Sequence, residues 1–444
     1  MPSKVVLTAG LSQPPAPGQE ADLILAWEGP QRNVLRNLDD LHALLPRHPS
    51  PLAADLTDIA AAVYMADIGL SRGRNEHWVR QISLQVPVRE PDFWPAHAED
   101  LSYLLYVLSR DSFSFDFVAR EAPDETLASE AAAAAPDCVC LFSGGVDSLA
   151  GAAMLLHTGR RPLLLCHQSG NPTIQAAQAR VAQLMEQLHP GASAFAGVRL
   201  QANGSCGAAT APFPPAAARE PSQRCRGFLY MSLALAAANA LGVEQAFLCE
   251  NGLLTMALPL SSARIGGQST RSTHPKVVAL VNRLAADAAL GCTLTNPFLY
   301  QTKAEVIRDL LRPVLPPFEI QRTVSCWATG RASRQCGGCV ACLVRRLSML
   351  AAGLPDEAYE LDVLGRPADY VGTDAYANLV DLLSLCSEFG RCSDLGLLQM
   401  SPELLDCAAA GVSLPEALGM YRRFAAEVHD VVHEHFPAAA KLTP

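Results

Sequence analysis

A glycine-rich segment, Ser143–Ser148, reads SGGVDS and follows the apolar run Cys138–Phe142. Paired glycines let the backbone approach an anion closely, and the amides that begin a following helix point at that anion. Serine hydroxyls at both ends add donors, and Asp147 would hold Mg²⁺ against a phosphate group. The segment therefore predicts a nucleotide-phosphate site, whose residues are Ser143, Gly144, Gly145, Val146, Asp147 and Ser148.

The SGGVDS segment has a plainer interpretation, an ordinary strand-to-helix turn in which Ser148 caps the helix. The complete hexapeptide between a strand and a helix favours nucleotide binding over that interpretation. It is not a Walker A loop, because the pattern GxxxxGK[ST] is absent. The hexapeptide resembles the PP-loop of ATP pyrophosphatases, and this resemblance implies cleavage of ATP between its α and β phosphates with an adenylated intermediate.

Four cysteines stand close together near residue 330, at Cys326, Cys336, Cys339 and Cys342. Four thiolates suit tetrahedral Zn²⁺ and leave no open position for water, so they predict a structural metal. Loss of that metal would unfold the surrounding region. A redox CxxC pair and an iron–sulfur cluster are alternatives, and the additional cysteines argue against the redox pair.

Other polar residues near expected strand ends and helix starts could complete a site for an anionic substrate. Arg271 and His274 precede an expected helix, where cations and amides would stabilise an anionic adenylate, and Lys303 begins another helix. Arg224 and Arg226 could contact phosphate as bidentate donors. Taken singly, each is better explained as a surface charge or a helix cap, and only convergence would favour function. The catalytic candidates are Asp147, Arg271, His274 and Lys303, and the substrate-binding candidates are Arg226, Glu250, Asn251, Thr270 and Arg271.

The elements that would position these residues alternate between strand and helix. This pattern predicts an α/β fold with a parallel sheet, right-handed crossovers and ligands beyond the carboxyl ends of the strands. We expect strands at Cys138–Phe142, Pro162–His167, Phe195–Leu200, Gln245–Glu250 and Thr293–Pro297. We expect helices at Ser148–His157, Ile174–Leu188, Gln223–Leu241, Pro275–Leu290 and Lys303–Leu311.

The pattern divides the chain into three parts. Residues 1–125 predict an N-terminal α+β accessory domain, and the alanine-rich segment Glu121–Asp137 is the expected linker. Residues 126–352 predict the nucleotide-binding domain with a zinc module at 322–350, and residues 353–444 a helical C-terminal extension. The expected N-terminal elements are strands at Ala21–Trp27 and His77–Val86 and a helix over Leu56–Ala66.

Composition limits the classes of function. At 444 residues, half of them apolar, the chain can bury a large core. A net charge of −10 without a basic block argues against an extended nucleic-acid surface and fits a small anionic substrate. The N-terminus lacks a secretory pattern, and the longest apolar run, Leu229–Val243, is too short to span a membrane. We therefore expect a cytoplasmic protein without a nucleic-acid partner.

The SGGVDS and four-cysteine motifs together resemble the QueC family, the 7-cyano-7-deazaguanine synthases, over about Cys138–Leu350. Further similarities lie at Thr302–Glu305, Thr323–Trp327 and Cys339–Arg345. The resemblance implies a Rossmann-like sheet with a C4 zinc site. It also implies that ATP activates 7-carboxy-7-deazaguanine and that ammonia then yields an amide, which is dehydrated to the nitrile. By position, the SGGVDS loop would bind the phosphates of ATP and the four cysteines would bind zinc.

The chain departs from the QueC pattern in two ways. It is about twice as long, and its loop Glu250–Pro275 resembles that of QueC-like proteins from anti-phage operons, the Qat system and type IV CBASS. This second resemblance implies a ligase that joins a deazaguanine carboxylate to an amine, expected to be a protein N-terminus. The expected partners are ATP, a 7-deazaguanine-type small molecule and the modified protein, which the N-terminal domain would help to hold. A homodimer is an open alternative to a monomer.

Three other functions stay open. Nitrile-forming QueC activity with ammonia is the first. RNA thiolation is the second, with Cys206 or Cys225 as the sulfur carrier, although the acidic balance of the chain disfavours it. The third is a scaffold that binds nucleotide without turnover.

Overall fold

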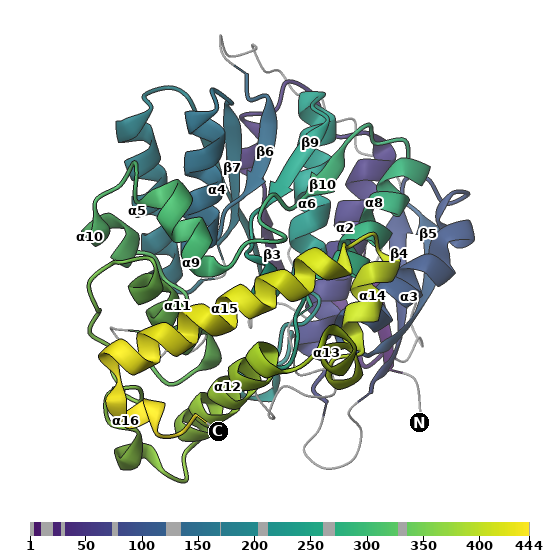
Figure 1. Ribbon diagram of the computed structural model, residues 1–444. Coiled ribbons are helices and arrows are strands. Elements are labelled where there is room, and N and C mark those ends of the chain that lie inside the picture. The colour runs from purple at the N-terminus through teal and green to yellow at the C-terminus, as the bar shows by residue number, and fades with distance from the viewer. Residues whose placement is uncertain are drawn as a thin grey trace.

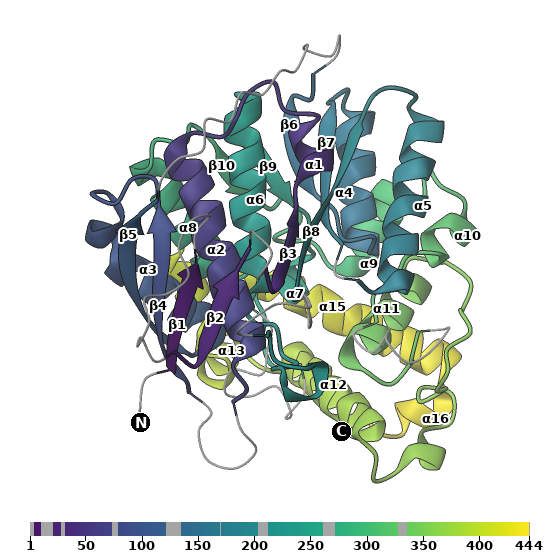
Figure 2. The ribbon, with the colours of Figure 1, turned by 180° about the vertical axis from the view of Figure 1, so that it is seen from behind.

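The structure, a computed structural model, describes residues 4–9, 21–27, 32–72, 79–120, 135–168, 170–202, 212–260, 271–326 and 335–443. Within these stretches the strands form a six-stranded central sheet and a four-stranded N-terminal sheet. Figures 1 and 2 show α2 (Pro51–Gly69) and α6 (Arg226–Leu241) between the sheets and the C-terminal helices across the lower part of the molecule.

The central sheet has the order β10-β9-β6-β7-β8-β3. Its strands are β10 (Thr293–Thr295), β9 (Gln245–Leu248), β6 (Cys138–Leu141), β7 (Pro162–His167), β8 (Ala194–Ala202) and β3 (Val34–Asn37). All neighbours are parallel except β3, which runs antiparallel to β8. The predicted parallel α/β sheet is therefore confirmed.

Helices connect and cover these strands. They are α4 (Val146–His157), α5 (Pro172–Leu188), α6 (Arg226–Leu241), α7 (Gly252–Thr255), α8 (Pro275–Asp287), α9 (Lys303–Val306), α10 (Pro317–Gln321) and α11 (Val340–Ala351). Every strand and helix expected in this region is present, β7 with the expected ends and the others with one or both ends shifted. The helix expected from Gln223 begins at Arg226, because the positive φ of Gln223, 46°, interrupts a helical backbone. The helix expected over Lys303–Leu311 is α9 continued by a π-helical turn, Ile307–Leu311.

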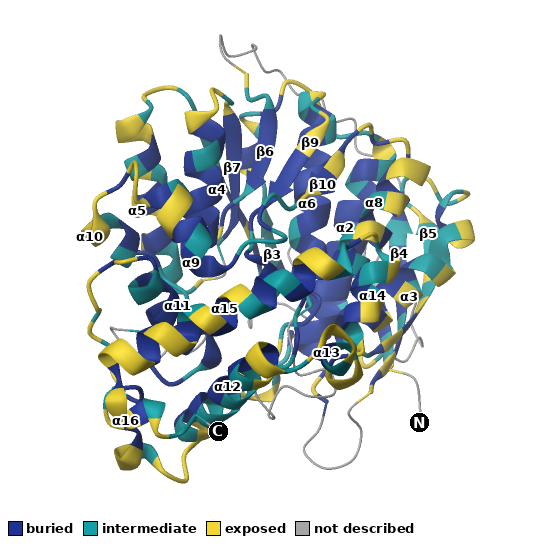
Figure 3. Cartoon of the chain, viewed as in Figure 1, coloured by how far each residue is buried: buried dark blue, intermediate teal, exposed yellow. Residues whose placement is uncertain are grey.

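Both faces of the central sheet are buried. Successive side chains of a strand point to opposite faces of the sheet and pack into two different hydrophobic cores. On β7, Leu163 and Leu165 pack into the core that contains α6, whereas Leu164 and Cys166 pack into the core beneath α4 and α5. Continuous apolar strands of this kind are typical of parallel sheets covered on both sides. Figure 3 shows the central strands and α4 mostly in the colour of buried residues.

The N-terminal sheet has the order β2-β1-β4-β5. Its strands are β1 (Lys4–Ala9), β2 (Leu23–Ala26), β4 (Gln81–Val88) and β5 (Ser112–Ala119), and the helices beside it are α1 (Asp39–His42), α2 (Pro51–Gly69) and α3 (Ala98–Ser109). The strands and the helix predicted here are found, with shifted ends. The pairing refines the α+β expectation, because all three strand pairs are parallel.

The N-terminal and central parts share one hydrophobic core. Strand β3 belongs to the first 125 residues in sequence but extends the central sheet, and α2 packs along α6. Side chains of α2 and α6, among them Ile59, Val63 and Leu235, lie in the same cluster. The domain boundaries near residues 125 and 352 stay predictions, and residues 121–134 of the expected linker lie outside the described stretches.

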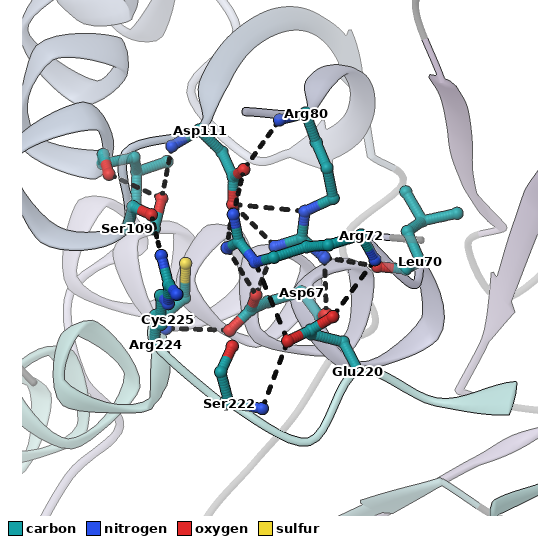
Figure 4. Close-up of polar contacts among 11 residues, drawn as sticks. Asp67, Leu70, Arg72, Arg80, Ser109, Asp111, Glu220, Ser222, Arg224 and Cys225 are labelled. Carbon is teal, nitrogen blue, oxygen red and sulfur yellow. Dashed lines mark hydrogen bonds and ion pairs between the residues drawn. The ribbon is translucent and has the colours of Figure 1, made fainter. Parts of the chain in front are cut away.

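A buried ionic cluster fastens the N-terminal sheet to the segment that leads into α6 (Figure 4). Asp111 accepts from Arg72 at 2.7 Å and from Arg80 at 2.6 Å. Asp67 pairs with Arg80 at 2.5 Å and accepts the amide of Cys225 at 2.9 Å. The buried ionic cluster consists of Asp67, Arg72, Arg80, Asp111, Glu220 and Arg224, so three arginines face three carboxylates.

The residues after 353 are helical, as predicted. The helices are α12 (Asp374–Arg391), α13 (Asp394–Met400), α14 (Glu403–Ala409), α15 (Leu414–His435) and α16 (Pro437–Ala440). They share a core with α7 and α11, and α15 crosses the front of the molecule in Figure 1 as its longest yellow helix. Among the described residues, no helix combines the length and the apolar composition needed to cross a membrane.

Candidate active site

The loop Ser143–Ser148 lies at the carboxyl end of β6 and runs into α4. Gly144 has a φ of +79°, and a Cβ at this position would lie 2.9 Å from the backbone nitrogen of Gln178. Only glycine fits there without displacing α5. The first turn of α4 has no side-chain cap, because its N-cap residue is Gly145, and the hydroxyl of Ser148 donates to the carbonyl of Gly145 at 2.9 Å. Uncapped amides at a helix start are suited to bind an anion.

Asp147 and Lys303 form a buried ion pair at this loop. Lys303 begins α9, and its Nζ contacts Oδ2 of Asp147. Asn251 donates to the same oxygen at 3.2 Å. The two charged residues are only 8% and 2% exposed, yet Oδ1 of Asp147 is buried without a hydrogen-bond partner in the described residues. An unpartnered buried carboxylate oxygen is a free ligand atom for a cation such as Mg²⁺.

A second carboxylate, Glu250, follows β9 and faces the same pair. Burial raises the pKa of Glu250 to about 7, the charge of Asp147 adds to this rise, and Lys303 opposes it. Thr273 donates to Oε2 of Glu250 at 3.4 Å. Two acids thus share one lysine, and a bound divalent cation would offset the missing positive charge.

The four predicted metal ligands come together at the start of α11. The sulfur atoms of Cys326, Cys336, Cys339 and Cys342 all lie within 4.8 Å of one another, and those of Cys336 and Cys342 are 3.8 Å apart. Zinc–sulfur bonds of about 2.3 Å in a tetrahedron give sulfur–sulfur edges of about 3.8 Å. The donor set and its spacing therefore fit a zinc ion with four protein ligands.

The segment before Cys326 connects the thiol cluster to the SGGVDS loop. The amide of Val324 donates to the carbonyl of Gly144 at 3.3 Å. Arg345 of α11, fully buried, donates to Oγ1 of Thr323 at 2.8 Å and pairs with Glu357 at 2.9 Å. The thiol cluster and Arg345 therefore fix the segment Thr323–Cys326, called the strap below, which packs against the SGGVDS loop. A cleft of about 330 Å³ lies between this strap and α5, with a lining that includes Thr173, Ala177, Arg180, Arg322, Val324 and Gln335.

His274 is held by structural contacts. Its Nδ1 accepts the amide of Lys276 at 3.2 Å and so caps α8, and its Nε2 lies 3.4 Å from the sulfur of Cys407 on α14. Burial lowers the pKa of His274 to about 4, and the charge of Arg271 adds to this effect. The neutral ring has a partner at each nitrogen, so capping explains its position, and its catalytic role stays a prediction.

The predicted arginines do not converge on the SGGVDS loop. Arg224 belongs to the buried ionic cluster, and Arg226 lies over the ring of Tyr230, 5.8 Å from its centroid. Burial lowers the pKa of Arg271, and the charge of Arg110 acts in the same direction. Within the described stretches, neither Arg226 nor Arg271 hydrogen-bonds or ion-pairs with this loop. Their substrate roles stay predictions, and Thr270 lies outside the described residues.

Several residues near the site carry no strong sequence signal. Gln178 packs against Gly144, donates to the carbonyl of His167 at 3.3 Å, and keeps a buried Oε1 without a partner in the described residues. An amphipathic helix pattern does not single it out. Thr302 and Glu305, which lie in the segment of similarity Thr302–Glu305, form a capping box around Lys303, and their T-x-x-E spacing is the sequence signal of that box.

A parallel sheet with SGGVDS at its carboxyl edge and a four-thiol cluster beside it defines a nucleotide-binding domain of the PP-loop class. The chain is 28% identical over 238 residues to the 7-cyano-7-deazaguanine synthase of Thiobacillus denitrificans, covering 50% of this chain and 96% of that protein. It is 28% identical over 241 residues to the synthase of Novosphingobium aromaticivorans, covering 50% and 93%. For the synthase of Aromatoleum aromaticum, the identity is 25% over 238 residues, covering 49% and 95%.

No protein-family model matches the chain. The similarity to several synthases, together with the sheet and the thiol cluster, supports a QueC-like family for the shared half of the chain. About half of its length corresponds to nearly the whole of each relative, so the other half is additional to the shared domain.

Proposed function

We propose that the chain is an ATP-dependent QueC-like ligase that adenylates a 7-deazaguanine carboxylate and transfers the acyl group to an amine. The observation that carries the proposal is the Asp147–Lys303 pair beside the SGGVDS loop, with its unpartnered carboxylate oxygen. The substrate class rests on the similarity to 7-cyano-7-deazaguanine synthases.

The proposed reaction has two steps. First, an oxygen of the substrate carboxylate attacks the α-phosphorus of ATP, the bond to the β-phosphate breaks, and pyrophosphate leaves with the electron pair. The amides at the start of α4 and the ammonium of Lys303 would stabilise the charge that develops on the leaving group. Then the amine nitrogen attacks the acyl carbon, the bond to AMP breaks, and the nitrogen loses a proton.

Two metal ions are part of the proposal. Asp147 would hold Mg²⁺ through its free oxygen, and the ion would neutralise phosphate charge when bound. The four cysteines would hold a structural zinc ion, which would fix the strap beside the SGGVDS loop. Two residues with predicted substrate-binding roles, Glu250 and Asn251, lie beside the Asp147–Lys303 pair.

We further propose that the acceptor amine is a protein N-terminus and that the reaction serves anti-phage defence. Support comes from the altered loop Glu250–Pro275 and from the additional half of the chain, whose elements pack around the shared domain. The alternative product, a nitrile formed with ammonia, draws its support from the relatives themselves, which are named as nitrile-forming synthases.

The test supplies 7-carboxy-7-deazaguanine and MgATP, with ammonia or with the proteins encoded beside this chain. Pyrophosphate release that depends on the carboxylate, together with a deazaguanine-sized mass increase on a protein N-terminus, is the expected result. Rapid nitrile formation with ammonia and no protein adduct would overturn the conjugation proposal. Pyrophosphate release without the carboxylate, or none at all, would reject the ligase and favour thiolation or a scaffold.

A further inference from the structure

The lysine of the Asp147–Lys303 pair belongs to a very short helix. Helix α9 contains only Lys303–Val306, and Lys303 is its first residue. The preceding residue, Thr302, accepts the amide of Glu305 at 3.1 Å, and Glu305 accepts the amide of Thr302 at 2.8 Å. This capping box encloses Lys303, so the positions of Thr302 and Glu305 determine where the lysine side chain begins.

Both side chains of the capping box form hydrogen bonds with side chains on one face of α15. Arg423 donates from Nε to Oε1 of Glu305 at 2.6 Å and from Nη2 to the carbonyl of Tyr300 at 2.7 Å. Glu427, one turn further along α15, accepts the hydroxyl of Thr302 at 2.8 Å. Residues four apart share a helix face, so α15 holds the box at two points.

The hydroxyl of Thr302 can satisfy both of its contacts in only one way. Its oxygen must accept the amide of Glu305, so its single proton is directed to Glu427. Thr302 is fully buried, and removal of the Glu427 carboxylate would leave that proton without its acceptor. Reorientation of the hydroxyl would then weaken the cap at the start of α9.

We infer that Glu427 of the C-terminal extension is a positioning residue, which acts through Thr302 to hold the Lys303 ammonium against Asp147. The C-terminal extension is then part of the catalytic architecture, although it lies far beyond the SGGVDS loop in sequence. The catalytic consequence rests on the proposed function, because it requires Lys303 to act on ATP. The structural consequence, a fixed and shielded lysine, does not.

The first experiment measures the chemical reactivity of Lys303, which needs no turnover. Intact protein is treated with an amine-acetylating reagent, and the acetylation rate at Lys303 is followed by peptide mass spectrometry. Glu427→Ala should raise this rate at least fivefold, whereas Glu427→Gln, which keeps an acceptor oxygen, should leave it within twofold. Glu434→Ala is the matched control, because Glu434 lies on the same helix and is 75% exposed. Equal reactivity in all variants would overturn the inference.

The second experiment measures pyrophosphate release at saturating and limiting ATP. Glu427→Ala should lower kcat about 10-fold to 100-fold with a smaller change in KM, and Glu427→Gln should restore most of kcat. In a Thr302→Val background, Glu427→Ala should add no further loss, because both changes break the same contact. Independent, additive losses would identify a general destabilisation and reject the positioning role.

The two experiments separate the inference from the proposed function. If the wild-type chain releases no pyrophosphate, the proposed function fails, and the reactivity of Lys303 still decides whether Glu427 positions it. If the wild type is active and Glu427→Ala changes neither the reactivity of Lys303 nor kcat, the inference fails and the proposed function stands.

Discussion

Among the buried charge groups of the described residues, two are completed to different degrees. In the buried ionic cluster between the N-terminal sheet and α6, three arginines face three carboxylates, and Asp111 alone accepts from both Arg72 and Arg80. Beside the SGGVDS loop, two carboxylates, Asp147 and Glu250, face a single ammonium, and one oxygen of Asp147 has no partner within the described residues.

On the proposed function, the difference separates charges that hold the fold from charges that would bind a ligand. Buried ions are costly unless they are paired and hydrogen-bonded, so a completed cluster can serve as a clamp between two elements. An incomplete group carries the same desolvation cost and has unmet capacity for a cation or a phosphate. We therefore expect substitution in the completed cluster to lower stability and leave activity unchanged, and substitution in the incomplete group to lower activity and leave stability nearly unchanged.

The largest expected effect concerns a third crowded group, the four thiols. Their sulfurs lie within 4.8 Å of one another, and deprotonated thiols at this spacing repel one another unless a cation joins them. We expect about one zinc ion per purified chain, and chelation should lower Tm by roughly 10 °C or more. Atomic emission and calorimetry measure both.

Cys392→Ser is the control for the zinc experiment, since Cys392 is a partly exposed cysteine outside the cluster, and this variant should keep its metal. A metal-free chain with an unchanged Tm would show that the thiols need no cation. The analogy between the thiol cluster and the incomplete charge group would then be wrong.

The next effect concerns the completed cluster. Asp111→Asn should destabilise the chain by about 3 to 5 kcal/mol, because Arg72 and Arg80 lose their shared counter-charge inside the protein. Urea unfolding measures the loss, and pyrophosphate release per folded molecule should not change. Asp100→Asn, which breaks an exposed pair with Arg283, should cost less than about 1 kcal/mol. Equal costs for the two variants would remove the distinction between a buried clamp and a surface pair.

Asp147→Asn should show the opposite behaviour. Turnover of ATP should fall about 1000-fold, on the order of 4 kcal/mol, because the negative charge that would hold Mg²⁺ is lost. Stability should change by less than about 1 kcal/mol, since Glu250 can ionise beside Lys303 once the charge of Asp147 is gone. Pyrophosphate release and urea unfolding of the same preparation make the comparison. A variant that is unstable but still active would place Asp147 among the clamps.

The smallest effect is on the pH dependence of stability. Burial raises the pKa of Glu427 to about 7, from 4.5 in the unfolded chain. Between these two pH values the folded state binds more protons than the unfolded state, so the free energy of unfolding should fall as pH rises from about 4.5 to 7. The contribution is on the order of 2 kcal/mol, and Glu427→Gln should remove it.

The pH prediction has its own control on the same helix. Glu416→Gln changes an exposed carboxyl of α15, so its unfolding curves at pH 5 and pH 7 should follow those of the wild type. If the free energy of unfolding of Glu427→Gln still falls as pH rises, other groups cause the pH dependence. Glu250 would then be the next residue to substitute.

Much of the central fold is readable from the sequence for a local physical reason. Strand β7 is apolar at every position before its last residue, His167, and α4 follows a glycine pair, and such patterns need only nearby residues. The four cysteines are readable as one site because a metal with soft ligands demands that residue type at short spacing. The start of α6 at Arg226, rather than at Gln223, is less readable, because the positive φ of Gln223, a non-glycine residue, has no sequence mark.

The contacts between distant segments follow a different rule. His274 has the residue type of an acid–base catalyst, but its ring caps α8 and contacts Cys407, more than a hundred residues away. Arg224 has the residue type of a phosphate ligand, but it joins the clamp of Figure 4. The residue type determines which chemical roles a side chain can have. The residues packed around it determine which of these roles it has in the folded protein.

By itself, the sequence determined the parallel sheet, the SGGVDS loop at its edge and the grouping of four thiols, because each depends on local pattern or short spacing. Only the tertiary structure decided that β3 extends the central sheet, that Lys303 meets Asp147, and that α15 grips the capping box around that lysine. The physical reason is that long-range pairing depends on which surfaces bury one another. That choice is made by the whole core and leaves no periodic mark in any one segment.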